Sequence, residues 1–270
     1  MLGMTMRISD ISQAAEILGR ARLDNAPVPE LLDGLTPHGS AEGYAVQAAL
    51  GAWFGKHSQG EIAGYKVGAT TRVMQDILKV TEPAFGRIFA ANVLASGASA
   101  TPGANVITGL ECEIAFRLGA DIAPSGSPVT WRDVMDCVEA VIPAIEIVQN
   151  RYGDFLSRGL GTLVADDFFH KALVLGEPID YRAALPLEEV VGRMIVDGNT
   201  IHMGTGAEVL GHPLEAVAWL ANALAGQVGS LKAGEIISSG SLTPVHWIEN
   251  YPCHARVELE GIGAAEVRLG

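Results

Sequence analysis

The sequence predicts an α/β (α+β) protein in which a helical N-terminal portion, residues 1–60, precedes a mixed β-roll, residues 61–270. Helical spacing of apolar residues dominates the first sixty positions. From Glu61 onward, short β-rich runs alternate with Gly and Pro. Because these runs do not alternate regularly with helical patterns, a doubly wound parallel sheet is disfavoured and a mixed, curled sheet or roll fits better.

Each element can be placed by its pattern. Helices are expected at 7–24, 40–56, 70–79, 130–137 and 213–228, with residues 26–38 as a Pro- and Gly-containing connection. The last of these helices has Pro213 in its first turn, where the missing N–H is harmless. Strands are expected at 62–68, 86–90, 110–118, 139–148, 171–175, 193–197, 235–239, 254–260 and 264–269.

Composition and charge exclude several classes of function. A 270-residue chain with 49% hydrophobic and 18% charged residues is typical of a well-cored globular protein. Its net charge of −13 argues against a nucleic-acid partner, which would require a basic surface. No apolar run approaches the roughly 18 residues that span a bilayer, so no membrane partner is expected. Three cysteines without CxxC spacing, and no signal-peptide pattern, indicate free thiols and a cytoplasmic protein.

Three glutamates stand out in apolar surroundings. On a strand over 110–118, Glu111 and Glu113 share one face, and Glu146 lies within the otherwise apolar run 143–148. Unpaired buried charges are costly, so three carboxylates are reasonable if they converge on a cation. Oxygen-only ligation suits Mg²⁺ or Mn²⁺. A solvated strand face, or an arginine paired with Glu146, would also explain the pattern.

Other residues could take part in chemistry. Lys66 lies between Gly64 and Gly68, where it could approach a ligand closely and where desolvation would lower its pKa towards the acid–base range. The alternative is a solvated lysine on an edge strand. Asp166 could orient a lysine or a water, or cap a turn. The run from 240 to 243 could present hydroxyl and N–H groups to a carboxylate, or simply turn.

A set of motifs, in order from about residue 40 to 270, carries a resemblance to a known family. They are Gly64-Tyr-Lys66-Val-Gly68, Glu82-Pro83-Ala-Phe-Gly86, Leu110-Glu-Cys-Glu113, Ile145-Glu146-Ile, Val164-Ala-Asp166 and Gly204-Thr-Gly206 through Pro213. Together they resemble the 2-keto-4-pentenoate (2-hydroxypentadienoate) hydratases and the similar 4-oxalocrotonate decarboxylases of the fumarylacetoacetate hydrolase superfamily.

This resemblance implies a mixed β-roll of the fumarylacetoacetate hydrolase C-terminal type. It implies Mg²⁺ or Mn²⁺ held by Glu111, Glu113 and Glu146, with Lys66 as an acid–base lysine. It also implies a cytoplasmic homo-oligomer that acts on 2-hydroxy-2,4-dienoates from aromatic meta-cleavage. A complex with a pathway enzyme is a further expected partner. The remaining assignments are Asp166 as a second catalytic residue, and Gly68, Phe85, Ser241 and Thr243 as substrate contacts.

The chain departs from the family pattern in several places, among them residues 249–253, which replace a Pro-Gly-Asp turn. Ala84 stands where the hydratases carry Asp, and Phe168-Phe169 replaces a small, polar pair. The leading hypothesis is a lyase: a metal-dependent hydratase that adds water to a 2-hydroxy-2,4-dienoate. A metal-dependent 2-oxo-acid decarboxylase is the alternative that Ala84 favours. A catalytically impaired homologue that binds 2-oxo acids is the third.

Overall fold

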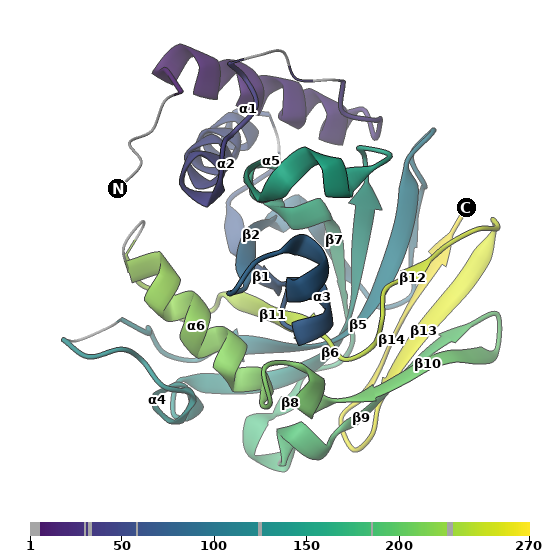
Figure 1. The fold of residues 1–270 in the computed structure, drawn as a ribbon. Coiled ribbons are helices and arrows are strands. Elements are labelled where there is room, and N and C mark those ends of the chain that lie inside the picture. The colour runs from purple at the N-terminus through teal and green to yellow at the C-terminus, as the bar shows by residue number, and fades with distance from the viewer. Residues whose placement is uncertain are drawn as a thin grey trace.

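The architecture is a mixed α/β fold built on two curled sheets (Figure 1), as the sequence predicts. It is seen in a computed structural model of the chain, which describes residues 6–29, 31, 34–57, 59–123, 126–184, 186–225 and 229–270. Within these residues, one sheet has nine strands and the other has five.

The larger sheet carries the longest strands at its centre. β5 (Ile107–Leu118) pairs with β6 (Val138–Asn150) in antiparallel register, and both are buried along most of their length. β1 and β11 are parallel, as are β3 and β7, whereas the other pairs are antiparallel. The order is β2 (Ala84–Phe89), β1 (Ile62–Gly68), β11 (Ile236–Ser241), β5, β6, β7 (His170–Leu175) and β3 (Val93–Ala95), with β12 (His246–Trp247) beside β5 and β8 (Ile179–Asp180) beside β6.

The smaller sheet closes over part of the larger one. Along β13 (Cys253–Leu259), buried and half-buried residues alternate, because one face lies on the core. β13 and β14 (Gly263–Leu269) both pack against β6, so the two sheets share one apolar interior. The order is β10 (Asn199–Thr205), β9 (Val191–Val196), β13, β14 and β4 (Ala98–Ala100).

Three helices form a layer at one end of the larger sheet (Figure 1). They are α1 (Ile8–Leu23), α2 (Ser40–Gly55) and α5 (Gly159–Ala165). α2 approaches α5 closely, since a Cβ atom at Gly43 would lie 2.5 Å from the carbonyl oxygen of Gly161. Their apolar faces form a second core cluster, which includes Leu18, Leu50 and Phe54.

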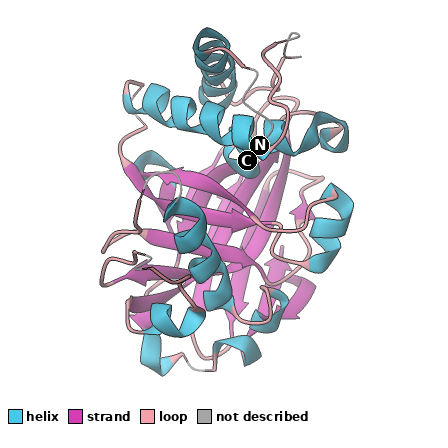
Figure 2. Cartoon of the chain, turned by 60° about the vertical axis from the view of Figure 1, so that its left-hand side comes forward, coloured by secondary structure: helices cyan, strands magenta, loops and turns pink. Residues whose placement is uncertain are grey.

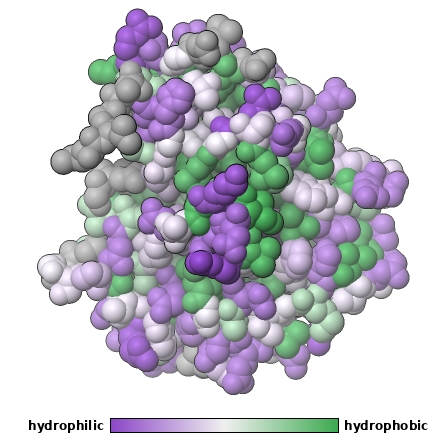
Figure 3. All heavy atoms as spheres, viewed as in Figure 1, coloured by the Kyte–Doolittle hydropathy of each residue, from purple (hydrophilic) through white to green (hydrophobic). Residues whose placement is uncertain are grey.

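The other helices cover different parts of the strands (Figure 2). α6 (Pro213–Ala225) packs on β1 and β11, and α4 (Trp131–Met135) packs on α6. α3 (Arg72–Leu78) exposes Val73 and Ile77, and the middle of the face seen in Figure 3 carries a hydrophilic stripe flanked by hydrophobic atoms. Among the described residues, no helix has the length and apolarity needed to cross a membrane.

The expected helices and strands are confirmed, with small shifts at their ends. Residues 226–228 of the last expected helix, and 30, 32 and 33 of the expected connection, lie outside the described residues. α5 and the strands β3, β4, β8, β10 and β12 were not predicted; α5 begins with Gly-Leu-Gly, a poor helical signal, and most of these strands are very short. The domain division at residue 60 stays a prediction.

Leu50 should be one of the residues that attach the helical layer. Its side chain is fully buried in the second core cluster, so Leu50→Ala should lower the free energy of unfolding by about 2–5 kcal/mol. Leu23→Ala, on the 42% exposed end of α1, is the control and should change it by less than about 0.5 kcal/mol. Urea unfolding measures the free energy of unfolding of both variants, and equal decreases in the two would contradict the packing described.

Candidate active site

Strand register gathers the predicted acidic residues on one face of the larger sheet. Glu111 on β5 lies directly opposite Glu146 on β6, and Glu113 is two positions further along the same face. On the other side of β5, Ser238 of β11 pairs with Ala115 and also with Lys66 of β1. Adjacent strands therefore bring these side chains together from positions up to 172 residues apart in sequence.

The three carboxylates form a compact cluster. A ligand oxygen from each of Glu111, Glu113 and Glu146 lies within 4.8 Å of the others. Glu113 and Glu146 are essentially inaccessible to solvent, whereas Glu111 is partly exposed. A fully solvated strand face is therefore the wrong interpretation of the Glu111 and Glu113 pattern.

Hydrogen-bond donors surround the two buried carboxylates. Ser238 Oγ and the backbone N–H of Gly240, at 3.2 Å, both donate to Glu113 Oε2. Lys66 Nζ lies 3.2 Å from Glu146 Oε2. The other oxygen of Glu146, Oε1, lies 2.8 Å from Nδ1 of the buried His170. Glu146 is thus paired with a lysine, and the arginine partner that the sequence left open is not the one found.

Burial and mutual repulsion control the protonation of the cluster. Burial, followed by the charge of Glu146, raises the pKa of Glu111 to about 8, although Lys66 opposes the shift. Burial and both neighbouring glutamates raise the pKa of Glu113 well above its ordinary value. Burial also raises the pKa of Glu146, against the attraction of Lys66. Burial holds the pKa of His170 well below its usual range, so its ring is neutral and can donate from Nδ1 to ionised Glu146.

The cluster fits a divalent cation. With all three carboxylates ionised, the Lys66 ammonium leaves two negative charges uncompensated, which is the charge that one divalent ion neutralises. Carboxylate oxygens are the ligands that Mg²⁺ and Mn²⁺ prefer. The raised pKa values of Glu111 and Glu113 have the same cause, because burial and the neighbouring carboxylates disfavour the ionised forms unless a positive charge compensates them.

Lys66 is a buried lysine on an inner strand. β1 is flanked by β2 and β11, and the side chain of Lys66 is only 3% exposed, so the edge-strand interpretation is wrong. Its ammonium also donates to the carbonyl oxygen of Phe168 at 3.2 Å. The expected lowering of its pKa is wrong for the protein without a cation: burial acts in that direction, but the attraction of the three glutamates outweighs it and raises the pKa.

Asp166 is engaged in an ion pair of its own. Arg151 Nη2 and Nε donate to Asp166 Oδ2 at 2.6 and 2.9 Å, and the Tyr152 hydroxyl donates to the same oxygen at 3.0 Å. All three residues are buried. The contacts give Asp166 a part in holding its loop, and a catalytic part stays a prediction.

The four predicted substrate contacts differ in position. Gly68 is close to the ammonium, because a Cβ atom built there would lie 3.3 Å from Lys66 Nζ. Ser241 pairs with Glu113 in the sheet register, and its hydroxyl donates to the carbonyl oxygen of Thr243 at 2.8 Å. The ring of Phe85 is fully buried and stacks on Tyr44 with centroids 4.4 Å apart. Their contacts with a substrate stay predictions, and the packing of Phe85 also gives it a place in the core.

Several residues of the site were not predicted. Ser238, His170 and the Phe168 carbonyl contact the glutamates or Lys66 directly. A signal existed for Ser238, since it lies in the expected strand 235–239, directly before the run 240–243 that was considered as a carboxylate contact. His170 had none, because its partner Glu146 lies 24 residues away on another strand.

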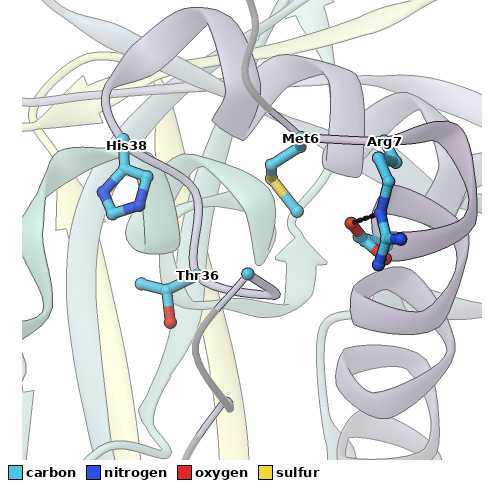
Figure 4. A pocket seen from close by; sticks show the side chains of 6 residues that line it. Met6, Arg7, Thr36 and His38 are labelled. Atoms are coloured by element: carbon cyan, nitrogen blue, oxygen red, sulfur yellow. Dashed lines mark hydrogen bonds and ion pairs between the residues drawn. The ribbon is translucent and has the colours of Figure 1, made fainter.

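A separate hollow lies within the helical layer (Figure 4). It has a volume of about 170 Å³ and is lined by Met6, Arg7, Asp10, Gly34, Thr36 and His38. Its one carboxylate, Asp10, is already paired with Arg7 at 2.8 Å. We therefore place the candidate active site at the glutamates and Lys66.

Comparison with known proteins identifies the family of the chain. Residues 82–269 match the model of the fumarylacetoacetate (FAA) hydrolase C-terminal family, a range that includes all three glutamates. The chain belongs to this family. The recognition made from the sequence motifs is confirmed.

Relatives in this family carry lyase names. The chain is 38% identical over 193 residues to the 2-hydroxyhexa-2,4-dienoate hydratase of Comamonas testosteroni, covering 70% of this chain and 72% of that protein. It is 32% identical over 270 residues to the 2-keto-4-pentenoate hydratase of Paraburkholderia xenovorans, covering 95% and 94%. The 4-oxalocrotonate decarboxylase of Pseudomonas putida G7, solved with magnesium and adipate, shares the fold: TM-score 0.90 at 23% identity, covering 99% and 100%. The chain is an enzyme of the lyase class.

Removing the charge of Glu113 should remove the metal response. Glu113→Gln keeps the shape of the side chain but loses a carboxylate, so the rise in melting temperature produced by Mn²⁺ should disappear. Glu139→Gln, at an exposed residue on β6, should keep the full rise. Thermal unfolding with and without Mn²⁺ measures both; unchanged Mn²⁺ affinity in Glu113→Gln would exclude Glu113 as a ligand.

The metal-free protein should lose stability as the pH rises. The pKa of Glu111 is about 8 in the folded protein against an ordinary value of 4.5, so between these values the folded chain retains a proton that the unfolded chain has lost. The free energy of unfolding should therefore decrease from pH 5 to pH 8. Urea unfolding at several pH values in a chelating buffer measures it, and Glu111→Gln should make the dependence less steep, because the raised pKa values of Glu113 and Glu146 remain; an equally steep profile in that variant would assign the effect to other groups.

Proposed function

We propose that this enzyme is a metal-dependent hydratase, which adds water to a 2-hydroxy-2,4-dienoate (2-oxo-4-enoate) to give a 4-hydroxy-2-oxo acid in aromatic meta-cleavage catabolism. The observation that carries the proposal is the cluster of three carboxylates beside a buried lysine. The names of the two hydratase relatives support the reaction. The chemistry of the cluster supports the metal dependence.

Glu111, Glu113 and Glu146 would hold the cation, Mg²⁺ or Mn²⁺. When bound, it would supply Lewis-acid polarisation of the 2-oxo-acid head of the substrate. The protein's own donors keep the ligand oxygens oriented: Ser238 and the Gly240 N–H fix Glu113, and His170 fixes Glu146.

Lys66 would hold and transfer the proton that the reaction needs on the carbon chain. Its ammonium is held between Glu146 Oε2 and the Phe168 carbonyl, each 3.2 Å away, and its side chain is 3% exposed. A positioned ammonium of this kind is a suitable general acid, and its deprotonated form a suitable base. At Gly68, beside the ammonium, the absence of a Cβ atom leaves room for the ring of Phe168.

A 2-oxo-acid decarboxylase is the second candidate. Ala84 favours it, because the hydratase motif that this chain resembles has Asp at that position, and the register places Ala84 opposite Gly68, close to Lys66. A catalytically impaired 2-oxo-acid-binding homologue is the third candidate, prompted by Ala84 and by the two rings of Phe168 and Phe169.

We also propose a cytoplasmic homo-oligomer. The three cysteines, Cys112, Cys137 and Cys253, are unpaired, which suits a reducing compartment. A complex with a pathway enzyme stays a prediction.

Turnover of candidate substrates separates these functions. With Mg²⁺ and 2-hydroxypenta-2,4-dienoate, the hydratase should remove the dienol absorbance and give a product heavier than the substrate by one water. Carbon dioxide release from 2-oxo-hexenedioate would identify the decarboxylase instead. Ketonisation without addition of water would refute the hydratase, and no turnover of either compound, with a dicarboxylate still raising the melting temperature, would identify the binding protein.

Lys66 should affect turnover far more than metal binding. Lys66→Ala removes the proton carrier but none of the three carboxylates, so kcat should fall by roughly 10²–10⁴-fold while Mn²⁺ still stabilises the protein. Lys232→Ala, at an exposed ion pair, is the control and should keep kcat. Steady-state kinetics and thermal shifts test this; retention of kcat in Lys66→Ala would remove Lys66 from the catalytic set.

A further inference from the structure

The loop that contacts Lys66 has an unusual backbone. Three consecutive residues, Asp167, Phe168 and Phe169, have positive φ angles of 48°, 51° and 69°. Residues with a Cβ atom rarely adopt this left-handed conformation, and each occurrence costs free energy. A run of three therefore persists only if the surrounding structure holds it in place.

The side chain of Asp167 provides that hold. Its Oδ1 accepts a hydrogen bond from the backbone N–H of Arg87 on β2 at 2.8 Å, and its Oδ2 accepts one from Arg22 Nη1. Arg22 and Asp167 are 5% and 1% exposed, so the ion pair is shielded from water. Arg22 is itself fixed by the ring of Phe54, whose centroid lies 4.8 Å from the guanidinium carbon.

The held segment contacts the catalytic lysine at two points. The Phe168 carbonyl accepts a hydrogen bond from Lys66 Nζ, and the Phe168 ring centroid lies 5.1 Å from the same atom. Gly68 makes room for this ring, since a Cβ atom there would lie 2.4 Å from it. The direction of the ammonium therefore depends on where the carbonyl of residue 168 is placed.

We propose that Arg22, on the N-terminal helix α1, is a positioning residue for Lys66: its buried ion pair with Asp167 holds the left-handed segment whose Phe168 carbonyl orients the lysine ammonium. This inference rests on the proposed function of Lys66. It assigns a catalytic consequence to a helix outside the matched family region of residues 82–269. A purely structural role for Arg22 would lower stability without altering Lys66 in the folded protein.

Kinetics of three variants test the positioning role. Arg22→Gln removes the charge, Arg22→Lys retains it, and Arg20→Gln on the same helix breaks only an exposed pair with Glu16. Because small displacements of a catalytic group cost up to about 100-fold in rate, kcat should fall roughly 10- to 100-fold in Arg22→Gln with KM changed less than about threefold. Arg22→Lys should retain part of the wild-type kcat, and Arg20→Gln should retain all of it.

A second measurement does not depend on turnover. In protein labelled with ¹⁵N-lysine, the Nζ signal of Lys66, assigned by its loss in Lys66→Ala, should shift in Arg22→Gln and return towards its original position in Arg22→Lys. Mn²⁺ binding should stay within about threefold, because the three glutamates are untouched. If Arg22→Gln does not fold, Asp167→Asn takes its place: it keeps an acceptor for the Arg87 N–H, and Asn tolerates the left-handed conformation.

The outcomes separate this inference from the proposed function. A shifted Lys66 signal in a protein whose wild type turns over no candidate substrate would support the positioning and refute the hydratase. An active wild type, with kcat and the Lys66 signal of the folded Arg22→Gln or Asp167→Asn variant equal to those of Arg20→Gln, would overturn the positioning role.

Discussion

Mutual repulsion among three carboxylates on one buried sheet face is the constraint on which the site depends. Glu111 and Glu146 lie directly opposite each other, and among the described residues it is Lys66, on β1 beyond β11, that pairs its positive charge with the cluster. Ser238 and His170 add neutral donors from two further strands. The order β1-β11-β5-β6-β7 therefore matters chemically: β5 and β6 carry the glutamates, and β1, β11 and β7 supply the groups that they need in order to ionise together around a cation.

The helical layer is part of the same arrangement. The buried Arg22 crosses from α1 to Asp167, and Asp167 is bound in turn to the backbone of Arg87. Removing one partner of such a pair leaves the other charge buried without a partner, which is strongly unfavourable. Together these contacts keep the left-handed segment above Lys66 in one conformation, so the helices do more than cover the end of the sheet.

Local pattern explains what the sequence could predict. Period-two alternation placed Glu111 and Glu113 on one face, and the apolar surroundings of Glu146 indicated burial. The family motifs added the link between these segments and Lys66. Strand register and long-range ion pairs could not be predicted from the sequence. No local signal sets Glu111 opposite Glu146, and the Arg22–Asp167 pair spans 145 residues. The direction of the pKa shift of Lys66 was mispredicted, because it depends on three glutamate charges that come together only in the folded protein.

The side chains around Lys66 also bear on the choice between hydration and decarboxylation. Ala84 and Gly68 are paired across β2 and β1, and the ring of Phe168 packs against Gly68, so the surroundings of Lys66 on this side are small or apolar. The decarboxylase substrate carries a distal carboxylate, and burying that charge against apolar groups without a partner is costly. A hydratase substrate ends in an uncharged chain, which these surroundings accept. Position 84 therefore bears on the reaction in two opposite ways: Ala84 lacks a carboxylate that could handle water, which favours the decarboxylase, whereas the apolar surroundings favour the uncharged tail of the hydratase substrate.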